Sequence, residues 1–250
     1  MCDRVAPPKV ALVTGSTSGI GAATARRLAR DGYTVALHSR SSVDVGRAMA
    51  SELKGASYHQ ADLGDENAAR DLVAGVLKQH GCLDVLVNNA GLSIRIPHTD
   101  LKAATPALWR QMLDVNLIAP FVLTAEAEPA LRKSAASGRP ASIVNIGTHA
   151  GARPKGSSIP YAASKAALHH VTRLLALSLG PDIRVNCVAP GLVETPMTAS
   201  WPDMLETWNT KSPMKRPAKP EDIADLVAAL CANDYVTGEI VIADGGLNLT

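Results

Sequence analysis

Short apolar runs alternate along the chain with longer segments whose apolar residues recur at helical spacing. The runs predict strands at Lys9–Val13, Thr34–His38, Ala56–His59, Asp84–Val87, Ser142–Ile146, Ile183–Val188 and Glu239–Ala243. The longer segments predict helices at Gly19–Asp31, Val43–Leu53, Glu66–Gln79, Trp109–Leu131, Tyr161–Leu179 and Ile223–Cys231. The segment Leu192–Pro220 follows neither period, so we expect it to be irregular.

Strands that alternate with helices are typical of βαβ units. The order therefore predicts the α/β class and a doubly wound parallel sheet of about seven strands with helices on both faces, a Rossmann-type fold. No repeat and no linker-like change in composition divides the chain, so we expect a single domain over residues 1–250. Ligands of such sheets bind at the carboxyl ends of the strands, which predicts one site on one edge of the sheet.

The composition argues against several classes of function. The 250 residues carry 25 Lys and Arg against 23 Asp and Glu, so neither nucleic acid nor an anionic membrane surface is an expected partner. No apolar run approaches the ~18 residues of a membrane span. The four cysteines form no C-x-x-C pair, no metal site is expected, and the first residues lack a secretory pattern. We therefore expect free thiols and a cytoplasmic protein.

A glycine-rich segment, Thr14-Gly-Ser-Thr-Ser-Gly-Ile-Gly21, joins the first strand to the first helix. Gly15 permits a tight turn, Gly19 lets the backbone approach a pyrophosphate, and Gly21 allows the helix to pack closely on the strand. The N–H groups at the helix start would then face the phosphates. The spacing G-x-x-x-G-x-G differs from the general G-x-G-x-x-G fingerprint, and an ordinary glycine-rich turn is the alternative. The position between strand and helix favours a nucleotide site.

Three further motifs follow in order, namely Asn88-Asn-Ala-Gly91, Tyr161-Ala-Ala-Ser-Lys165 and Pro190-Gly191. Together with the glycine-rich segment, their order and spacing resemble the short-chain dehydrogenase/reductase family from about Lys9 to Leu247. Within this family, the chain resembles 3-oxoacyl carrier protein reductases and pteridine reductases. The resemblance implies an oxidoreductase that interconverts a carbonyl and an alcohol by hydride transfer with a nicotinamide cofactor.

The end of the second strand decides which nicotinamide cofactor we expect. A carboxylate there would bind the ribose 2′-hydroxyl of NAD and repel the 2′-phosphate of NADP, whereas an arginine would neutralise that phosphate. Here the position holds Ser39, Arg40 and Ser41 follow it, and His38 is a further candidate. We therefore predict NADP(H). Ser18 stands where many NADP-preferring relatives carry a second basic residue, which leaves a partial preference open.

The resemblance implies a cofactor site made of the residues that match the family motifs. They are Gly15, Ser16, Ser18, Gly19, Ile20, Gly21, Ser39, Arg40, Ser41, Asp62, Leu63, Asn88, Ala90, Gly91, Tyr161, Lys165, Pro190, Gly191, Val193 and Thr195. Asp62 would hold the adenine amino group, and its alternative role is to cap the following helix. Thr195 would bind the nicotinamide carboxamide.

Tyr161 and Lys165 are four residues apart on a predicted helix and therefore share one face. A nearby ammonium would lower the pKa of the tyrosine from ~10 and prepare it for proton transfer. The resemblance also implies that the backbone carbonyl of Asn116 binds a water connected to Lys165. A solvent-facing Asn116 is the alternative.

The family usually carries a serine thirteen residues before the tyrosine, and this chain has Thr148 there. Threonine keeps the hydroxyl that would polarise the substrate carbonyl, while its methyl group stiffens the side chain and narrows the pocket. We predict that Thr148 serves as the polarising hydroxyl. The alternative is that Ser157, Ser158 or no side chain does so.

The segment 192–220 is expected to form a substrate-binding lid, or else to pack against the protein's own body or a neighbouring subunit. The residues that suggest an apolar cover are Met197, Trp201, Met204, Leu205, Trp208 and Met214. Arg95, His98 and His149 are expected near the mouth of the pocket. Arg132 and Lys133 offer little positive charge for docking an acidic acyl carrier protein, and pteridine reductases usually carry Asp at position 148. The substrate class therefore stays open.

The resemblance implies a homotetramer in which the helices Trp109–Leu131 and Tyr161–Leu179 make the contacts. A function of another class also stays open, namely a non-catalytic NADP-binding sensor or scaffold on the same fold, because a fold does not determine a function. The presence of both Tyr161 and Lys165 favours the enzyme.

Overall fold

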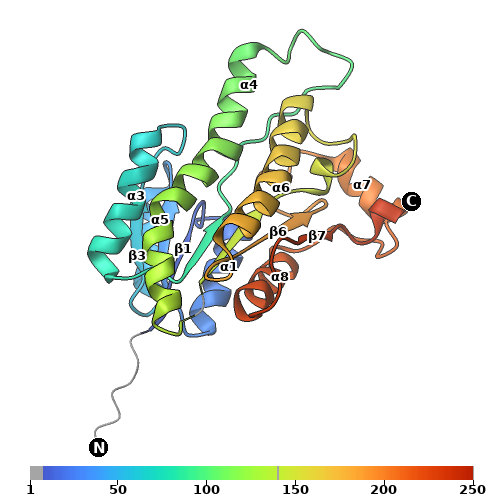
Figure 1. Cartoon of the computed structure of the whole chain (residues 1–250). Helices are drawn as coiled ribbons and strands as arrows, with labels where there is room; N and C mark the ends of the chain where they lie inside the picture. The colour runs from blue at the N-terminus through green and yellow to red at the C-terminus, as the bar shows by residue number, and fades with distance from the viewer. Residues whose placement is uncertain (1–7, 140, 250) are drawn as a thin grey trace, which may run out of the picture.

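A sheet of seven parallel strands forms the centre of the protein in the computed structural model, which describes residues 8–139 and 141–249 (Figure 1). The strands are β1 (Val10–Val13), β2 (Thr34–Ser39), β3 (Ser57–Gln60), β4 (Val85–Asn88), β5 (Ser142–Ile146), β6 (Arg184–Pro190) and β7 (Ile240–Ala243). Their order is β3-β2-β1-β4-β5-β6-β7 and every neighbouring pair is parallel. The predicted doubly wound sheet is confirmed. The order reverses between β1 and β4, which marks the expected ligand crevice.

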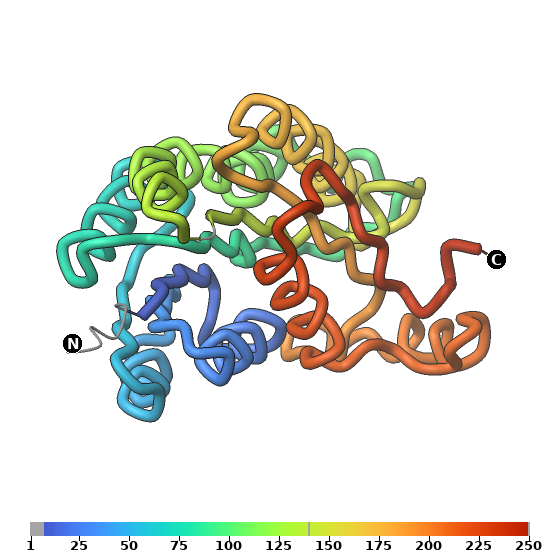
Figure 2. Tube along the Cα trace, turned by 60° about the horizontal axis from the view of Figure 1, so that its bottom comes forward, coloured from blue at the N-terminus to red at the C-terminus, as the bar shows by residue number. Residues whose placement is uncertain are grey.

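Helices cover both faces of the sheet. They are α1 (Gly19–Arg30), α2 (Val43–Glu52), α3 (Glu66–His80), α4 (Pro106–Leu113), α5 (Ala119–Ala136), α6 (Ile159–Leu179), α7 (Pro202–Lys211) and α8 (Pro220–Ala232). Short helical turns lie at Asp114–Ile118, His149–Gly151 and Leu247–Leu249. Figure 2 shows the layers, with α3, α5 and α6 on one side of the sheet and α1, α2 and α8 on the other. Among the described residues, no helix is long and apolar enough to cross a membrane.

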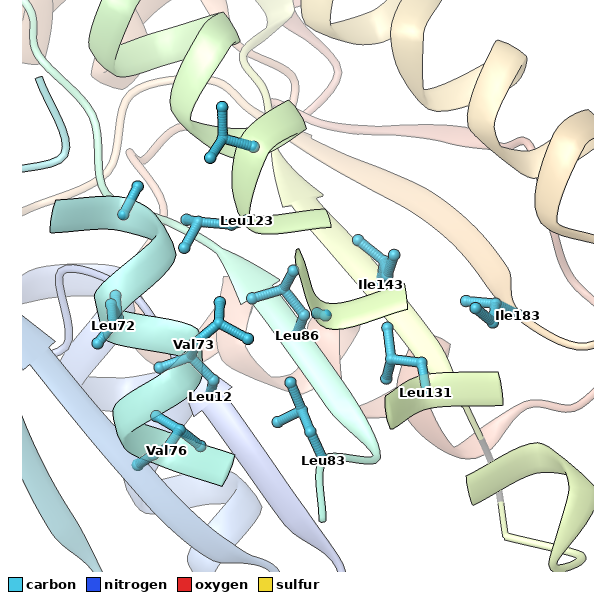
Figure 3. Close-up of a cluster of buried hydrophobic side chains, with 14 of the residues drawn as sticks. Leu12, Leu72, Val73, Val76, Leu83, Leu86, Leu123, Leu131, Ile143 and Ile183 are labelled. Atoms are coloured by element: carbon cyan, nitrogen blue, oxygen red, sulfur yellow. The ribbon is translucent and has the colours of Figure 1, made fainter. Parts of the chain in front are cut away.

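Alternate strand residues supply two hydrophobic cores. Leu12 and Leu86 belong to the core under α3, α5 and α6, which Figure 3 shows with Leu72 and Leu123 around them. Val13, the next residue of β1, belongs to the core under α1 and α8. Because both faces of the sheet are covered, the strands read as continuous apolar runs rather than alternating ones. This is why the short apolar runs identified the strands.

Two predictions about helices need correction. The segment Leu192–Pro220 is not irregular throughout, because α7 occupies Pro202–Lys211, with Pro202 in its first turn and Trp208 buried beneath it. The single helix predicted at Trp109–Leu131 is in fact α4 and α5 joined by a π-helical turn at Asp114–Ile118. A π turn is rare and carries no periodicity signal of its own, and such turns are frequent at functional sites.

The helix after β3 is capped by a residue other than the predicted one. Asp65 is the N-cap of α3 and its carboxylate accepts hydrogen bonds from Asn67 N and Ala68 N. Asp62 instead accepts from Gly64 N at 3.0 Å, within the turn that follows β3. The prediction that Asp62 caps α3 is therefore wrong. Asp62 lies beside the end of β3, where it lines the cavity described below.

A buried arginine joins β6 to α8. Arg184, at the start of β6, donates from Nη1 to the carbonyl of Leu230 at 2.7 Å and from Nη2 to that of Cys231 at 3.0 Å. These carbonyls belong to the last turn of α8, where a helix leaves its C=O groups unpaired and favours positive charge. Burial lowers the pKa of Arg184 from its ordinary value. The bonds therefore satisfy a helix end that would otherwise be buried without partners.

Candidate active site

One cavity of about 470 Å³ runs along the carboxyl ends of the central strands. Its lining includes most residues predicted for the site, namely Gly15, Ser18, Gly19, Ile20, Gly21, Ser39, Arg40, Ser41, Asp62, Leu63, Ala90, Gly91, Thr148, Tyr161, Lys165, Pro190, Gly191, Val193 and Thr195. Ser16, Asn88 and Asn116 are the predicted residues that do not line it. The sheet thus gathers segments from both halves of the chain onto one edge.

The glycine-rich segment has the backbone geometry that a phosphate cradle needs. Gly15 and Gly19 have φ of 61° and 51°, a region that favours glycine. A Cβ at Gly21 would lie 2.2 Å from the carbonyl oxygen of Gly15, so α1 begins in direct contact with the loop. On the opposite side, a Cβ at Gly19 would meet Thr195 Cγ2 at 3.0 Å. The start of α1 and the segment after β6 therefore face each other at close range, which fits a dinucleotide pyrophosphate at a helix N-terminus.

His38 is part of this loop rather than a free donor for the cofactor. Its Nδ1 accepts from Gly15 N at 3.1 Å, so its Nε2 carries the proton and donates to the carbonyl of Ala61 at 3.1 Å. Burial lowers the pKa of His38 to about 4. His38 is therefore neutral near pH 7 and joins the ends of β1, β2 and β3.

Ser16 was predicted to bind the cofactor and is instead fully buried. Its Oγ accepts from His38 N at 2.8 Å, and its own N–H donates to the carbonyl of His38 at 2.9 Å. The amides of Gly15 and Ser16 are both engaged within the protein. Thr17, which the sequence analysis missed, lines the cavity in place of Ser16.

Of the two asparagines at the end of β4, the unpredicted one lines the cavity and the predicted one does not. Asn88 is buried below the cavity, where its Nδ2 donates to Asn145 Oδ1 at 2.9 Å in a chain of hydrogen bonds that continues to Thr172. Asn89, which was not predicted, lines the cavity, and its Nδ2 donates to the carbonyls of Thr14 and Gly15 at 2.8 and 3.1 Å. The doubled asparagine therefore clamps the loop after β4 to the glycine-rich segment.

Tyr161 and Thr148 face the same part of the cavity from α6 and from the end of β5. Burial raises the pKa of Tyr161 to about 12, and a hydrogen bond with the Thr148 hydroxyl opposes that rise. Thr148 Oγ1 also lies 3.3 Å from the carbonyl of Pro190, to which it can donate. Ser158 cannot take the place of Thr148 here, because it is buried and its Oγ caps α6 by accepting from Tyr161 N.

The Lys165 ammonium makes its hydrogen bond to the backbone, and the predicted effect of Lys165 on the pKa of Tyr161 stays a prediction. Its Nζ donates to the carbonyl of Ile146 at 2.8 Å, and burial lowers its own pKa to about 8. Burial is the larger influence on the pKa of Tyr161, and the hydrogen bond with Thr148 opposes it. The i, i+4 spacing correctly placed both side chains in one cavity, but it carried no information about the partner that the ammonium selects.

Asn116 lies in the π turn and is fully buried, so the solvent-facing alternative is wrong. Its Oδ1 accepts from Leu92 N at 2.8 Å, while its Nδ2 donates to the carbonyl of Leu92 at 2.9 Å and to Ser164 Oγ at 3.1 Å. A Cβ at Gly91 would lie 3.3 Å from Asn116 Oδ1 and 3.6 Å from Lys165 Nζ. Asn116 thus joins the loop after β4 to α6 beside the lysine.

An apolar wall closes the other end of the cavity. Trp201, Met204 and Trp208 line it from α7 and its start, and Met197 lines it from the preceding turn. Trp208 donates from Nε1 to the carbonyl of Asp244 at 3.3 Å and packs edge-on against His149, with ring centroids 5.4 Å apart. Met214, which was grouped with these residues, lies outside the cavity lining and is 62% exposed.

Several polar residues of this end were not predicted as site residues or were placed only near the mouth. Ser93, which was not predicted, and Ser157, an alternative to Thr148 as the polarising hydroxyl, line the cavity with their hydroxyl oxygens 2.7 Å apart. Arg95 and His98 do not line it, and Arg95 instead forms a salt bridge with Asp203 of α7. His149 does line it, and burial lowers its pKa.

Known proteins resemble the chain over nearly its whole length. The sequence profile of the family described as Enoyl-(Acyl carrier protein) reductase matches residues 15–248. A Streptomyces violaceoruber protein that bears the name of granaticin polyketide synthase ketoacyl reductase 2 is 46% identical over 243 residues, covering 96% of each chain. The human dehydrogenase/reductase SDR family member 4 is 37% identical over 250 residues, covering 95% of this chain and 87% of the relative.

Solved structures share the fold, and two of them were solved with a nicotinamide cofactor. A 3-ketoacyl-(acyl-carrier-protein) reductase from Brucella melitensis, complexed with NADH, has a TM-score of 0.88 and 30% identity, covering 96% of this chain and 98% of its own. A blue fluorescent protein from a metagenomic library, in complex with NADPH, has a TM-score of 0.84 and 36% identity, covering 96% and 97%. With these matches and the ordered motifs on one sheet edge, the chain belongs to the short-chain dehydrogenase/reductase family, whose members are oxidoreductases acting on carbonyl and alcohol groups.

Proposed function

We propose that the protein is an NADP(H)-dependent oxidoreductase that interconverts a ketone and a secondary alcohol. One observation carries this proposal: the hydroxyls of Tyr161 and Thr148 meet in the cavity that the glycine-rich segment opens into. The bound cofactor would supply the hydride chemistry. The protein would supply orientation, a proton donor and the exclusion of water.

Tyr161 is proposed as the acid. With its pKa raised to about 12, the phenol is protonated at neutral pH and can donate a proton to the oxygen of a carbonyl that is being reduced. Thr148 would donate a second hydrogen bond to that oxygen and stabilise the charge that develops on it. Lys165 would resupply the proton through the buried region beside Asn116, whose backbone carbonyl stays our proposed water site.

Two features support a preference for NADP(H). The end of β2 carries Ser39 and no carboxylate, and among the described residues no salt bridge involves the exposed Arg40. A guanidinium without an acidic partner is available to a phosphate. Relatives of similar fold have been solved with NADPH and with NADH, so the fold accommodates either cofactor. The preference therefore rests on these side chains.

The substrate portion of the cavity suits an uncharged ketone. The charged residues in the cavity lining are Arg40, Asp62 and Lys165, all assigned above to the cofactor or to proton transfer. A carboxylate in the substrate portion would lack a cationic partner and would be costly to bury. The relatives named as ketoacyl reductases act, by their names, on the ketone of a ketoacyl group. Arg132, considered for docking an acyl carrier, is engaged by Glu128 and Asp182.

We also propose that residues 192–220 act as a substrate lid and that the chain assembles as a homotetramer. Phe121 on α5 and Leu177 on α6 are 52% and 85% exposed, and both lie on the helices proposed for the contact. Large apolar residues in such positions favour an interface between copies of the chain.

The test is NADPH oxidation against a panel of uncharged ketones, diketones, quinones, pterins and an acetoacetyl thioester. Tyr161→Phe should lower turnover about 10²–10⁴-fold without loss of NADPH binding. Tyr235→Phe is the matched control, because Tyr235 is 93% exposed, and it should leave turnover unchanged. Tight NADPH binding with no turnover of any compound would favour a non-catalytic sensor or scaffold. Turnover that survives Tyr161→Phe would contradict the assignment of the acid.

A further inference from the structure

A tyrosine on the neighbouring strand holds the end of β2 where the cofactors are distinguished. Tyr58 Oη lies 2.8 Å from Ser39 Oγ. The Tyr58 ring lies directly on α2, since a Cβ at Gly46 would be only 2.1 Å from it. Two residues further along β3, Gln60 Nε2 donates to the carbonyl of Arg40 at 3.0 Å. Strand β3 therefore holds Ser39 by its side chain and Arg40 by its backbone.

We propose that Tyr58 is a positioning residue for the 2′-phosphate of NADP(H), acting through the hydroxyl of Ser39. The proposal rests on the preference for NADP(H) argued above. Ser39 lines the cavity and is nearly buried, whereas Tyr58 does not line the cavity. Any effect of Tyr58 on the cofactor must therefore pass through Ser39 or through the position of the β2 end.

The direction of the hydrogen bond between Ser39 and Tyr58 can distinguish NADPH from NADH. In the pair between Ser39 and Tyr58 either hydroxyl can be the donor. A phosphate dianion only accepts, so Ser39 must give it its single proton, and Tyr58 must then donate to Ser39 Oγ. Hydrogen bonds in such a chain polarise and strengthen one another. By donating to Ser39 Oγ, Tyr58 thus orients the Ser39 hydroxyl and strengthens the hydrogen bond that it gives to the phosphate.

NADH does not require one direction of the hydrogen bond between Ser39 and Tyr58. The ribose 2′-hydroxyl of NADH can donate or accept, so Ser39 can bind it with either orientation of its own proton. The neighbouring candidates do not replace Tyr58, because both ring nitrogens of His38 are already engaged with Gly15 and Ala61. The role of the Tyr58 hydroxyl should therefore appear with NADPH and be small with NADH.

The test measures dissociation constants of NADPH and NADH by fluorescence titration for the wild type, Tyr58→Phe, Ser39→Ala and the double variant. Phenylalanine keeps the ring that packs on Gly46, so the fold should persist. Tyr58→Phe should weaken NADPH about five-fold, the scale of one hydrogen bond, and change NADH less than about two-fold. It should have no further effect in the Ser39→Ala background, because the two residues act as one unit.

Tyr33→Phe is the matched control. Tyr33 directly precedes β2 at the end away from the cavity, and the substitution should leave the ratio of the two dissociation constants unchanged. Equal weakening of NADPH and NADH by Tyr58→Phe, or additive effects of Tyr58→Phe and Ser39→Ala, would overturn the role of Tyr58 alone. The dissociation constants of the wild type are measured first. Equal affinity of the wild type for both cofactors would overturn the NADP(H) preference itself.

Discussion

Protonation of His38 at low pH should weaken the hydrogen bonds that hold the glycine-rich segment in place. The neutral ring accepts from Gly15 N through Nδ1 and donates to Ala61 through Nε2. A proton on Nδ1 would set two N–H groups against each other and leave Gly15 N without an acceptor. Because the pKa of His38 falls from 6.5 to about 4 on folding, its stabilising contribution is complete above pH 6.5 and is lost as the pH falls toward 4.

The size of the effect follows from the two pKa values. A shift from 6.5 to about 4 removes about 2.5 kcal/mol of stability between pH 7.5 and 4.5. Many carboxylates, and His169, whose pKa is also lowered to about 4, titrate over the same range. The measurement is therefore a difference: the free energy of unfolding in urea of the wild type minus that of His38→Asn, at both pH values. Asparagine keeps an acceptor near Nδ1 and does not titrate.

The wild type should lose about 2.5 kcal/mol relative to His38→Asn on going from pH 7.5 to 4.5. NADPH should also bind the wild type more weakly at the lower pH, since Gly15 begins the segment that faces the phosphates. A difference in stability that stays constant with pH would refute the reasoning, because it would show that His38 binds no fewer protons in the folded protein than in the unfolded chain.

Three further outcomes are expected. Thr148→Ala should lower turnover about 10²–10³-fold while Thr148→Ser stays near the wild type, and full activity of Thr148→Ala in a steady-state assay would contradict the role of the hydroxyl. Arg184→Met should reduce the free energy of unfolding in urea by about 2–4 kcal/mol, because two carbonyls at the end of α8 lose their partner, and an unchanged midpoint would refute this. Sedimentation should show a tetramer at micromolar concentration, and a monomer would rule out the proposed assembly.

Sequence reasoning succeeded where a role depends on the local chain. The strand, turn and helix around Gly15, Gly19 and Gly21 form one continuous segment, so their backbone roles follow from residue type and spacing. The placement of Tyr161 and Lys165 on one helix and in one cavity followed in the same way, while their roles stay predictions. The parallel sheet followed for the same reason, since each βαβ unit is a local pattern whose handedness and direction are nearly fixed.

Sequence reasoning failed where the role of a residue depends on contacts between distant segments. Asn89 takes its role from Thr14, 75 positions earlier, and nothing in its own motif separates it from Asn88. Ser16 and Thr17 are neighbours of the same polar type, and the pairing of Ser16 with His38 decides which one is buried. The signal that could have identified Asn89 is the alternation of strand faces, which sends Asn88 toward Asn145 and leaves its neighbour on the cavity side.

Burial is the other property that spacing does not reveal, and here it changes the chemistry. The expected pair was a phenolate stabilised by an ammonium, whereas burial keeps the phenol of Tyr161 protonated and lowers the pKa of Lys165 to about 8. A phenol with a pKa of about 12 is a proton donor near pH 7 and a poor base. The protonation states of these two residues are therefore set by their environment in the fold rather than by the motif.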